Sequence, residues 1–538
     1  MGRMRRPQPA LVETVAAAAG AGASIAVLLA RLVPDVAREP LFVDEVVTAM
    51  TASRPLGEML DVVVLDRGGA PGHFVLVHLA FLAHASADVL RWLSVLCAIG
   101  ALLVAFDLGR RLHSRIAGVG ASVVLATSPL VGVYGTFGRM YALFALVGAA
   151  AADLLVRAHE ARTTRTALEA GAVVALLPLV HPYGLLPAGL VVGAVALRWR
   201  RRWRHLLVLA AAAALVAVPV VLASARLSDR FGVARNNNAR LLSPSETFDY
   251  VWRTFSDYAG TRGAAVVVPI LLALVGVFAL RTSRRWFVVL ALLAIVLPFL
   301  LLALLPTGRP QGVAHVSTRH LIFWLPCYAA LIGVGAAHVL GRLPRPLVLA
   351  AGILLAAFFA YFGGRGIADP RESSKLNQAT AKPRFLRDPA DWLGRTTEPG
   401  DLLYFPSPLW AAALPDTRDA WLLDAAPGGI LGRTLERVEF PVPGGAVAIP
   451  VGLSAVELAP LARLERADVY SSDRWVVIRA TGPFRDQREA LDRLHAAWVV
   501  GMAAVPSASG RLRAHLRDNE ANLCRALRRS GGDCPASP

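Results

Sequence analysis

Residues 89–109 read VLRWLSVLCAIGALLVAFDLG, an apolar run with one arginine near its start and one aspartate near its end. At about 1.5 Å per helical residue, such a run crosses a hydrocarbon core of about 30 Å. Eight runs of comparable length lie at 11–33, 116–134, 140–156, 205–225, 264–280, 286–305, 320–340 and 346–363. A longer stretch, 166–197, is interrupted by His181-Pro182-Tyr183-Gly184 and is typical of a helical hairpin. The sequence therefore predicts a polytopic α-helical membrane protein with about 11 transmembrane helices.

The composition supports a membrane protein and excludes two other classes. Of the 538 residues, 55% are hydrophobic and only 17% are charged, whereas soluble domains carry about 25% charged residues. A disordered chain would contain far fewer apolar residues. The net charge of +18 comes almost entirely from arginine, since Lys375 and Lys382 are the only lysines. The arginines lie mostly in short loops and form no basic stripe with interleaved aromatics, so nucleic acid is not expected as a partner.

The distribution of arginine predicts how the chain crosses the membrane. With a cytoplasmic N-terminus, the loops 1–10, 110–115, 157–166, 198–204, 281–285 and 341–345 face the cytoplasm and hold 19 arginines. The loops on the other side hold only 12 arginines in 97 residues, against 19 in 43 residues, which agrees with the excess of basic residues in cytoplasmic loops. The run 71–85 is only about 22 Å long as a helix and would reverse this bias if it crossed. We therefore expect it to be a surface helix on the outer side, and the C-terminus to be extracytoplasmic.

After about Gly366 the composition becomes that of a soluble domain. Short β-like runs at 401–405, 421–424 and 474–480 alternate with helical patterns at 389–396, 454–464, 487–499 and 510–530. We therefore predict two domains. Residues 1–365 form the transmembrane domain, whose first external loop (34–88) contains the surface helix 71–85. Residues 366–538 form an extracytoplasmic mixed α/β domain.

Four cysteines give a weak indication of the compartment. Cys97 and Cys327 lie in predicted spans and are expected to be packing residues. Cys524 and Cys534 flank a Gly-Gly turn, where both a disulfide in an oxidising compartment and two thiols fit the sequence. No CxxC motif and no Cys/His spacing typical of a metal site occurs in the sequence. Nothing therefore indicates a divalent metal, and no cofactor is predicted.

Adjacent carboxylates, Asp44 and Glu45, follow the first span in the segment LFVDE (41–45). A carboxylate at the membrane boundary with a raised pKa can accept a proton from a hydroxyl nucleophile. The alternative is structural: two acidic residues are favoured in the first turn of a surface helix, here from Asp44 to about Ser53, because they interact with the helix dipole. The spacing alone favours the structural alternative and does not exclude catalysis.

Two arginines stand at the outer ends of predicted spans, where arginine is otherwise sparse. Arg139 precedes the fourth span in FGRMYAL (137–143), and Arg319 precedes the tenth in STRHL (317–321). Each needs an anion, and a phosphate at the level of the lipid headgroups is a candidate. The alternative for each arginine is an unspecific interaction with headgroups, in which the side chain extends toward the membrane surface.

The remaining polar residues near the predicted spans are more simply explained as structural. His181, at the tip of the hairpin, is either a ligand or a hydrogen-bonded structural histidine. His73 and His78 are five residues apart, which does not match the spacing of a helical metal pair. Asp107 and Asp153 lie near cytoplasmic helix ends beside arginines, so we expect ion pairs there.

Taken together, these segments resemble the motifs of the GT-C superfamily of polytopic glycosyltransferases. The resemblance is greatest to the branch of the protein O-mannosyltransferases and the lipid A aminoarabinose transferase. It covers residues 10–365 and depends on the order and spacing of the motifs. The matched segments are Asp44-Glu45, APGHFVL (70–76) as the surface segment, the span from Arg91 to GRRL (109–112), SP (128–129), GRMYAL (138–143), HPY (181–183), RHL (319–321) and LP (325–326).

The resemblance implies an inverting glycosyltransferase at the outer face of the plasma membrane. It moves a monosaccharide from a polyprenyl-phosphate donor to an acceptor hydroxyl on a glycan, a lipid or a protein. Asp44 is implied as the general base, and Glu45 as a residue that orients either the acceptor or Asp44 itself. The residues implied to bind donor or phosphate are Arg139, Tyr141, His181, Arg319 and His320. The alternative is a non-catalytic protein that binds or transports a lipid-linked sugar, although transporters usually have repeated halves and discontinuous helices.

Overall fold

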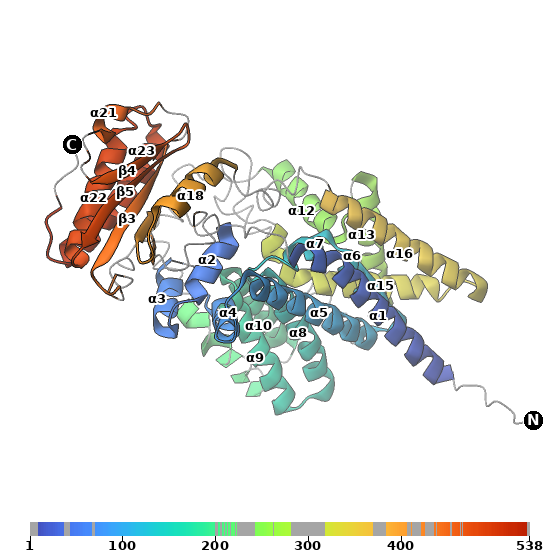
Figure 1. The fold of residues 1–538 in the computed structure, drawn as a ribbon. Helices are drawn as coiled ribbons and strands as arrows, with labels where there is room; N and C mark the ends of the chain where they lie inside the picture. Colours follow the sequence, from blue (N-terminus) through green and yellow to red (C-terminus); the bar gives the residue numbers. More distant parts are fainter. Residues whose placement is uncertain are drawn as a thin grey trace, which may run out of the picture. The chain divides into compact units, whose positions relative to one another are not determined.

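Figure 1 shows the computed structural model of the chain. It describes residues 9–36, 43–66, 70–198, 243–261, 263–280, 318–368, 384–405, 421–424, 438–451, 455–462 and 466–534, with a few isolated positions between them. Two compact units are present: one contains Met1–Arg38 and Thr48–Leu376, and the other contains Glu39–Val47 and Asn377–Pro538. The predicted domain boundary between 365 and 366 stays a prediction.

The first unit is helical. Most of its long helices occur where the apolar runs predict them, whereas the helices at 56–66 and 244–259 lie outside those runs. In chain order they are α1 (Pro9–Val36), α2 (Val43–Ala52, which begins in the second unit), α3 (Leu56–Asp66), α4 (Gly72–Phe81), α5 (Ala87–Leu112), α6 (Arg115–Thr127), α7 (Pro129–Tyr134), α8 (Tyr141–Ala161), α9 (Thr164–Val180), η1 (Pro182–Gly184), α10 (Leu185–Arg198), α12 (Pro244–Ala259), η3 (Gly263–Val266), α13 (Val267–Ala279), η4 (Thr318–Trp324), α15 (Leu325–Leu340) and α16 (Arg345–Ala368).

Local sequence signals fix the ends of these helices. The side chains of Ser86, Ser114 and Thr163 accept hydrogen bonds from backbone N–H groups in the first turns of α5, α6 and α9. Pro129 at the start of α7 cannot continue the hydrogen bonding of α6, so the predicted span 116–134 is divided in two. The predicted hairpin is confirmed, with α9 and α10 separated by η1.

Within the described ranges, five helices are long and apolar enough to cross a membrane, or six if α12 and α13 form one bent span. The run 286–305 and much of 205–225 lie outside the described residues. A polytopic helical membrane fold is therefore confirmed, and the count of 11 spans stays a prediction. Helix α4 has only ten residues, or about 15 Å, which is too short to cross alone.

Glycines allow close packing of helices within the first unit. A Cβ on Gly335 of α15 would overlap the backbone of Leu272 in α13, and a Cβ on Gly276 of α13 would overlap the backbone of Leu331. The backbones of α13 and α15 therefore touch, as is typical of membrane helices that meet at small residues.

One end of the helical unit carries the predicted ion pairs. Asp107 of α5 accepts hydrogen bonds from Arg111 at 2.7 Å and from Arg157 of α8 at 2.9 Å. Asp153, which is buried, lies 2.7 Å from Arg157 and 3.2 Å from Arg111. These interactions join α5 to α8 and confirm that both aspartates form ion pairs with the neighbouring arginines.

The second unit contains a five-stranded mixed sheet in the order β2-β1-β3-β5-β4 (Figure 1). Strand β1 pairs in parallel with β2 and β3, and β5 pairs antiparallel with β3 and β4. Helices α22 and α23 pack together, α22 lies against β3 and β5, and α18 lies against β4 and β5. The elements are α18 (Arg384–Thr396), β1 (Leu402–Phe405), β2 (Trp421–Asp424), β3 (Val442–Pro450), α21 (Leu458–Leu461), β4 (Ala467–Ser471), β5 (Trp475–Phe484), α22 (Gln487–Ala503) and α23 (Gly510–Arg529).

Strict alternation of side chains gives the sheet two buried faces. On β5, Val476 and Ile478 join the core under α22 and α23, whereas Trp475 and Val477 join the core under α18. The mixed α/β organisation predicted for this region is therefore confirmed. The helix predicted over 454–464 is wrong in extent, because the described helix is only Leu458–Leu461. Strands β3 and β4 had no counterpart among the predicted runs.

A buried ion pair supports one end of the sheet. Arg479 of β5 donates from Nε to Asp401 at 2.8 Å and from Nη2 to Glu398 at 2.9 Å. Asp401 is completely buried, and its carboxylate also accepts from the backbone N–H of Glu398 at 3.0 Å. The guanidinium of Arg479 therefore compensates the negative charge of a carboxylate that has no access to water.

Replacing Arg479 with leucine should lower the free energy of local unfolding of this sheet by about 3–5 kcal/mol, because a buried carboxylate loses its counter-charge. Hydrogen exchange of the β5 amides in the full chain measures this change. The matched control is Arg474→Leu, since Arg474 is half exposed and pairs with the exposed Asp473 at 3.7 Å. We expect the control to change the free energy by less than about 0.5 kcal/mol, and equal effects of both variants would contradict the assignment.

Candidate active site

The loop between α7 and α8 is held from two sides. Ser94 of α5 donates a hydrogen bond to the backbone oxygen of Phe137 at 2.8 Å, and Nε2 of His73 in α4 donates to that of Gly138 at 3.4 Å. Both donors are buried. The position of the next residue, Arg139, is therefore set by the backbone and not only by its own side chain.

Arg139 is partly buried and contacts a neutral side chain. Its Nη1 donates to the hydroxyl of Thr48 in α2 at 3.2 Å. Its Nε is buried, and no described residue accepts a hydrogen bond from it. A buried guanidinium N–H without an acceptor is costly, so this geometry fits an anion that the guanidinium binds.

The interruption between α9 and α10 places His181 against aromatic rings. Nδ1 of His181 accepts from the backbone N–H of Tyr183 at 3.1 Å, so this nitrogen carries no proton. Pro182 occupies the first position of η1, where its fixed φ favours the turn. The imidazole stacks on Phe144 and on Tyr183, with both ring-centroid distances at 5.3 Å.

The short helix η4 brings Arg319 and His320 to the same neighbourhood. Cζ of Arg319 lies 5.5 Å from the ring centroid of Tyr141, a cation–π distance. The ring of His320 lies 5.2 Å from that of His181 and 4.8 Å from that of Tyr183. Tyr258 of α12 donates to the backbone oxygen of Leu321 at 2.7 Å and thereby fixes η4.

Ring and cation–π contacts join Tyr141, His181, Tyr183, Arg319 and His320; together with Arg139, two residues before Tyr141, we call them the arginine–aromatic cluster. The rings of Tyr141 and His181 are 6.1 Å apart, and those of Tyr141 and His320 are 6.2 Å apart. All five residues predicted to bind donor or phosphate therefore lie together. They come from the start of α8, the turn after α9 and η4, which are separated by long stretches of sequence.

Burial and positive charge keep two histidines of this region neutral. The pKa of His73 is lowered to about 3, mainly by burial and to a smaller extent by the nearby charge of Arg139. At His181, burial and the charges of both Arg139 and Arg319 lower the pKa to about 3. Both positive charges therefore oppose protonation of His181. Neutral imidazoles can donate from Nε2 to a ligand without adding charge.

The stability of the protein should fall between pH 7 and pH 5 because of these histidines. An unfolded histidine takes up a proton below about pH 6.5, whereas the folded site does not, so stability is greatest above that pH and is lost on acidification. The variant His73→Gln, whose amide can still donate to Gly138, should show a smaller fall in thermal midpoint. His84→Gln, at an exposed position, serves as control and should behave like the unmodified protein.

Asp44 and Glu45 occupy the first turn of α2, as the structural alternative predicts. Glu45 is buried, and Asp44 is partly buried. Asp44 precedes Thr48 by four residues, so both side chains lie on one face of α2. The catalytic roles of both carboxylates stay predictions.

Three residues at the site had no strong signal in the sequence. Thr48 and Tyr183 are neutral residues in ordinary helical and turn contexts, and only the folded chain shows their contacts with Arg139 and His320. The sequence places His73 in the surface segment APGHFVL (70–76) and in a pair with His78 whose spacing does not match a helical metal site. His73 binds a backbone oxygen, while His78 lies apart from it and contacts the backbone oxygen of Ala52 at 2.8 Å.

Comparisons with known proteins agree with this architecture. Residues 70–223 match the family described as dolichyl-phosphate-mannose-protein mannosyltransferase. A search of curated proteins finds no match. The crystal structure of ArnT from Cupriavidus metallidurans bound to undecaprenyl phosphate is similar, with a TM-score of 0.58 and 15% identity over 87% of this chain and 99% of that chain.

Two further solved structures are similar to the chain. ArnT from the same organism in the apo state has a TM-score of 0.58 and 14% identity, and the match covers 89% of this chain and 100% of that chain. The archaeal oligosaccharyltransferase AglB from Archaeoglobus fulgidus, in complex with an inhibitory peptide and a dolichol-phosphate, has a TM-score of 0.49 and 12% identity over 81% of this chain and 69% of that chain. The resemblance indicated by the sequence motifs is confirmed by the match over residues 70–223 and by the two ArnT structures: the chain is a polytopic membrane protein with the GT-C fold.

Proposed function

We propose that this protein is a glycosyltransferase that moves a monosaccharide from a polyprenyl-phosphate donor to an acceptor hydroxyl, at the outer face of the plasma membrane. The observation that carries the proposal is the convergence of Arg139 and Arg319 on one wall of aromatic and imidazole rings. The family matched by residues 70–223 is named for a lipid-phosphate sugar donor, and the similar ArnT structure binds undecaprenyl phosphate.

The two arginines suit the phosphate of such a donor. Guanidinium groups bind phosphate oxygens through charge-assisted hydrogen bonds, often two at a time. Nη1 of Arg139 donates to the neutral hydroxyl of Thr48, and the charge of Arg319 lies over the Tyr141 ring. Aromatic faces such as Tyr141 and Tyr183 suit the apolar faces of a sugar ring. The cluster thus offers cationic groups for the phosphate beside flat rings for the sugar.

The proposed reaction is a single displacement at the anomeric carbon. The acceptor oxygen forms a bond to that carbon while the bond from the carbon to the phosphate oxygen breaks, and the phosphate leaves with the electron pair. Asp44 takes the proton of the acceptor hydroxyl, and Glu45 orients the acceptor or Asp44. Arg139 and Arg319 stabilise the charge that grows on the leaving phosphate. Attack opposite to the leaving group inverts the configuration of the anomeric carbon.

The position of Asp44 in α2 supports its role as the base. It lies one helical turn before Thr48, and the Thr48 hydroxyl accepts the hydrogen bond from Arg139. In the proposed reaction, the Asp44 carboxylate accepts the proton of the acceptor hydroxyl while the arginines hold the phosphate. The extracytoplasmic domain predicted over 366–538 would then bind a glycan, lipid or protein that carries the acceptor hydroxyl.

Turnover of a radiolabelled polyprenyl-phospho-sugar by the purified full chain in lipid tests the proposal. We expect release of polyprenyl phosphate together with transfer of label to the acceptor, with donors bearing different sugars compared in parallel. The contrary result is saturable donor binding without release of polyprenyl phosphate for every sugar and acceptor tested. It would show that the protein is a non-catalytic binding or transport protein.

A further inference from the structure

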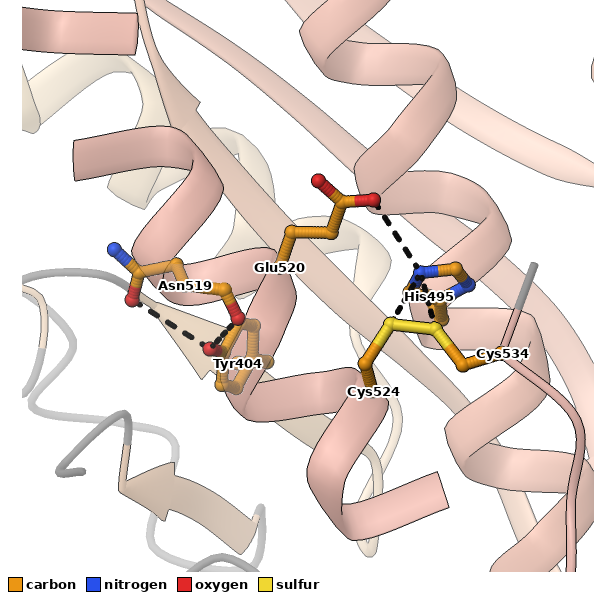
Figure 2. The surroundings of a disulfide bond; sticks show 6 residues. All are labelled: Tyr404, His495, Asn519, Glu520, Cys524 and Cys534. Atoms are coloured by element: carbon orange, nitrogen blue, oxygen red, sulfur yellow. Dashed lines mark hydrogen bonds and ion pairs between the residues drawn. A yellow bond between two sulfur atoms is a disulfide. The ribbon is translucent and has the colours of Figure 1, made fainter. Parts of the chain in front are cut away.

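Four side chains of metal-ligand type meet in the C-terminal unit. Figure 2 shows His495, Glu520, Cys524 and Cys534 pointing toward one another around the Cys524–Cys534 disulfide. His495 comes from α22, Glu520 and Cys524 from α23, and Cys534 from the segment after α23. His495 and Glu520 are both buried, whereas the two cysteines are partly exposed.

The sequence builds this arrangement through two local devices. Glu520 and Cys524 are four residues apart on α23, so they share one face of the helix. After Arg529 the chain reverses at Gly531, whose φ of +78° strongly favours glycine. The N–H of Gly532 bonds to the backbone oxygen of Leu527 at 3.0 Å, which closes the helix and returns Cys534 to Cys524.

The framework around the group is fixed by buried contacts. The hydroxyl of Tyr404 in β1 donates to the backbone oxygen of Asn519 at 2.9 Å, next to Glu520 (Figure 2). Nε1 of Trp498, three residues after His495, donates to the backbone oxygen of Leu516 at 3.3 Å. These bonds hold α22 and α23 against each other, so His495, Glu520 and Cys524 lie on packed helices, while Cys534 is held by the turn after α23.

The ligand atoms of His495, Cys524 and Cys534 lie within 4.8 Å of one another, and the distances from Nε2 of His495 are close to the edge length of a tetrahedral zinc site. Nε2 of His495 lies 3.3 Å from Sγ of Cys524, 3.6 Å from Sγ of Cys534 and 3.7 Å from Oε1 of Glu520. With zinc–sulfur bonds of about 2.3 Å and zinc–nitrogen or zinc–oxygen bonds of about 2.0–2.2 Å, neighbouring ligand atoms lie about 3.5 Å apart. One nitrogen, one oxygen and two sulfurs complete four-coordinate zinc.

We propose that the reduced form of this site binds one zinc ion through His495, Glu520, Cys524 and Cys534, and that the disulfide is the oxidised, metal-free state of the same site. A thiol reductant supplies two electrons and two protons, the sulfur–sulfur bond breaks, and the reductant becomes a disulfide. Zinc then binds the two sulfurs as thiolates and displaces their protons into solvent. Oxidation by a disulfide reverses both steps and releases the ion.

Zinc binding by the full chain, prepared reduced or oxidised, tests the proposal. After incubation with zinc and gel filtration under anaerobic conditions, mass spectrometry should find one zinc per chain in the reduced protein and none in the oxidised protein. Cobalt in place of zinc should give a sulfur-to-metal absorption band only after reduction. Equal zinc content in both preparations, or no zinc in either, would overturn the proposal.

Two variants and one measurement on the unmodified protein distinguish the loss of a zinc ligand from the loss of the fold. Glu520→Gln should weaken zinc binding at least tenfold, while Asp518→Asn, at an exposed position on the same helix, should leave it unchanged. In the unmodified reduced protein, zinc should slow alkylation of Cys524 and Cys534 at least tenfold, as read by peptide mapping. Unchanged alkylation rates would exclude the sulfurs as ligands even if the variants fail to fold.

Discussion

Asp44→Asn should lower kcat for sugar transfer by a factor of about 10²–10⁴, the usual contribution of a general base. Asparagine has nearly the same size as aspartate, and it can still accept hydrogen bonds in the first turn of α2. It cannot take the proton of the acceptor hydroxyl. The loss should therefore appear in kcat, while the KM for the polyprenyl-phosphate donor stays within about twofold.

The matched control for Asp44 is Asp61→Asn. Asp61 is an exposed residue of α3 in the same external loop, and the substitution removes the same charge. We expect the control to keep full turnover. A loss of the same size in both variants would show that the net charge of the loop matters and that Asp44 is not the base. Undiminished transfer by Asp44→Asn would remove this residue from the mechanism.

Arg139→Ala and Arg319→Ala should each lower kcat/KM for the donor about 10- to 100-fold. A hydrogen bond to a charged group contributes about 1.5–3 kcal/mol, and each variant removes the positive charge together with its donors. The KM for the acceptor should change little, because the arginines are assigned to the phosphate. Arg139→Lys should recover only part of the loss, since an ammonium group keeps the charge and lacks the planar pair of donors.

A double-mutant cycle tests whether the two arginines hold the same group. If both contact one phosphate, the double variant should lose less than the product of the single losses, with a coupling of about 0.5–3 kcal/mol. Arg253→Ala removes a charge at an exposed position of α12 and is the control. Strict additivity of Arg139→Ala and Arg319→Ala would indicate two separate sites.

Most helices of the first unit are predictable from the sequence, because a helix that crosses lipid must be apolar along its length. This apolar character is visible in each segment by itself. The run 89–109 corresponds to α5, and 140–156 corresponds to α8. The observed helices extend beyond the apolar runs, since their ends are set by caps such as Ser86 and not by hydrophobicity. The division of 116–134 follows from Pro129, which the apolar pattern alone does not reveal.

The sheet of the second unit is less predictable, because strands are stabilised by partners distant in the sequence. Strand β3 reads VPGGAVAIP, whose prolines and glycines are typical of a turn, yet β1 and β5 pair with it on both sides. The four zinc-ligand candidates show the same limit. His495 precedes Cys524 by 29 residues, so no spacing rule brings them together before α22 packs on α23.

The candidate site is predictable for its charged residues and not for its neutral ones. Arg139 and Arg319 stand out because arginine is scarce on the predicted outer side, and the structure does bring them to the same aromatic wall. Thr48 and Tyr183 carry no such signal. Their contacts depend on how α2 and η1 meet the start of α8, which is a property of tertiary packing.

The most direct measurement is a structure of the full chain in lipid with bound polyprenyl phosphate. We expect phosphate density in contact with the guanidinium groups of Arg139 and Arg319, with the Asp44 carboxylate facing the side from which an acceptor hydroxyl would approach. Phosphate bound away from both arginines, or Asp44 on the opposite side of the membrane from them, would contradict this expectation.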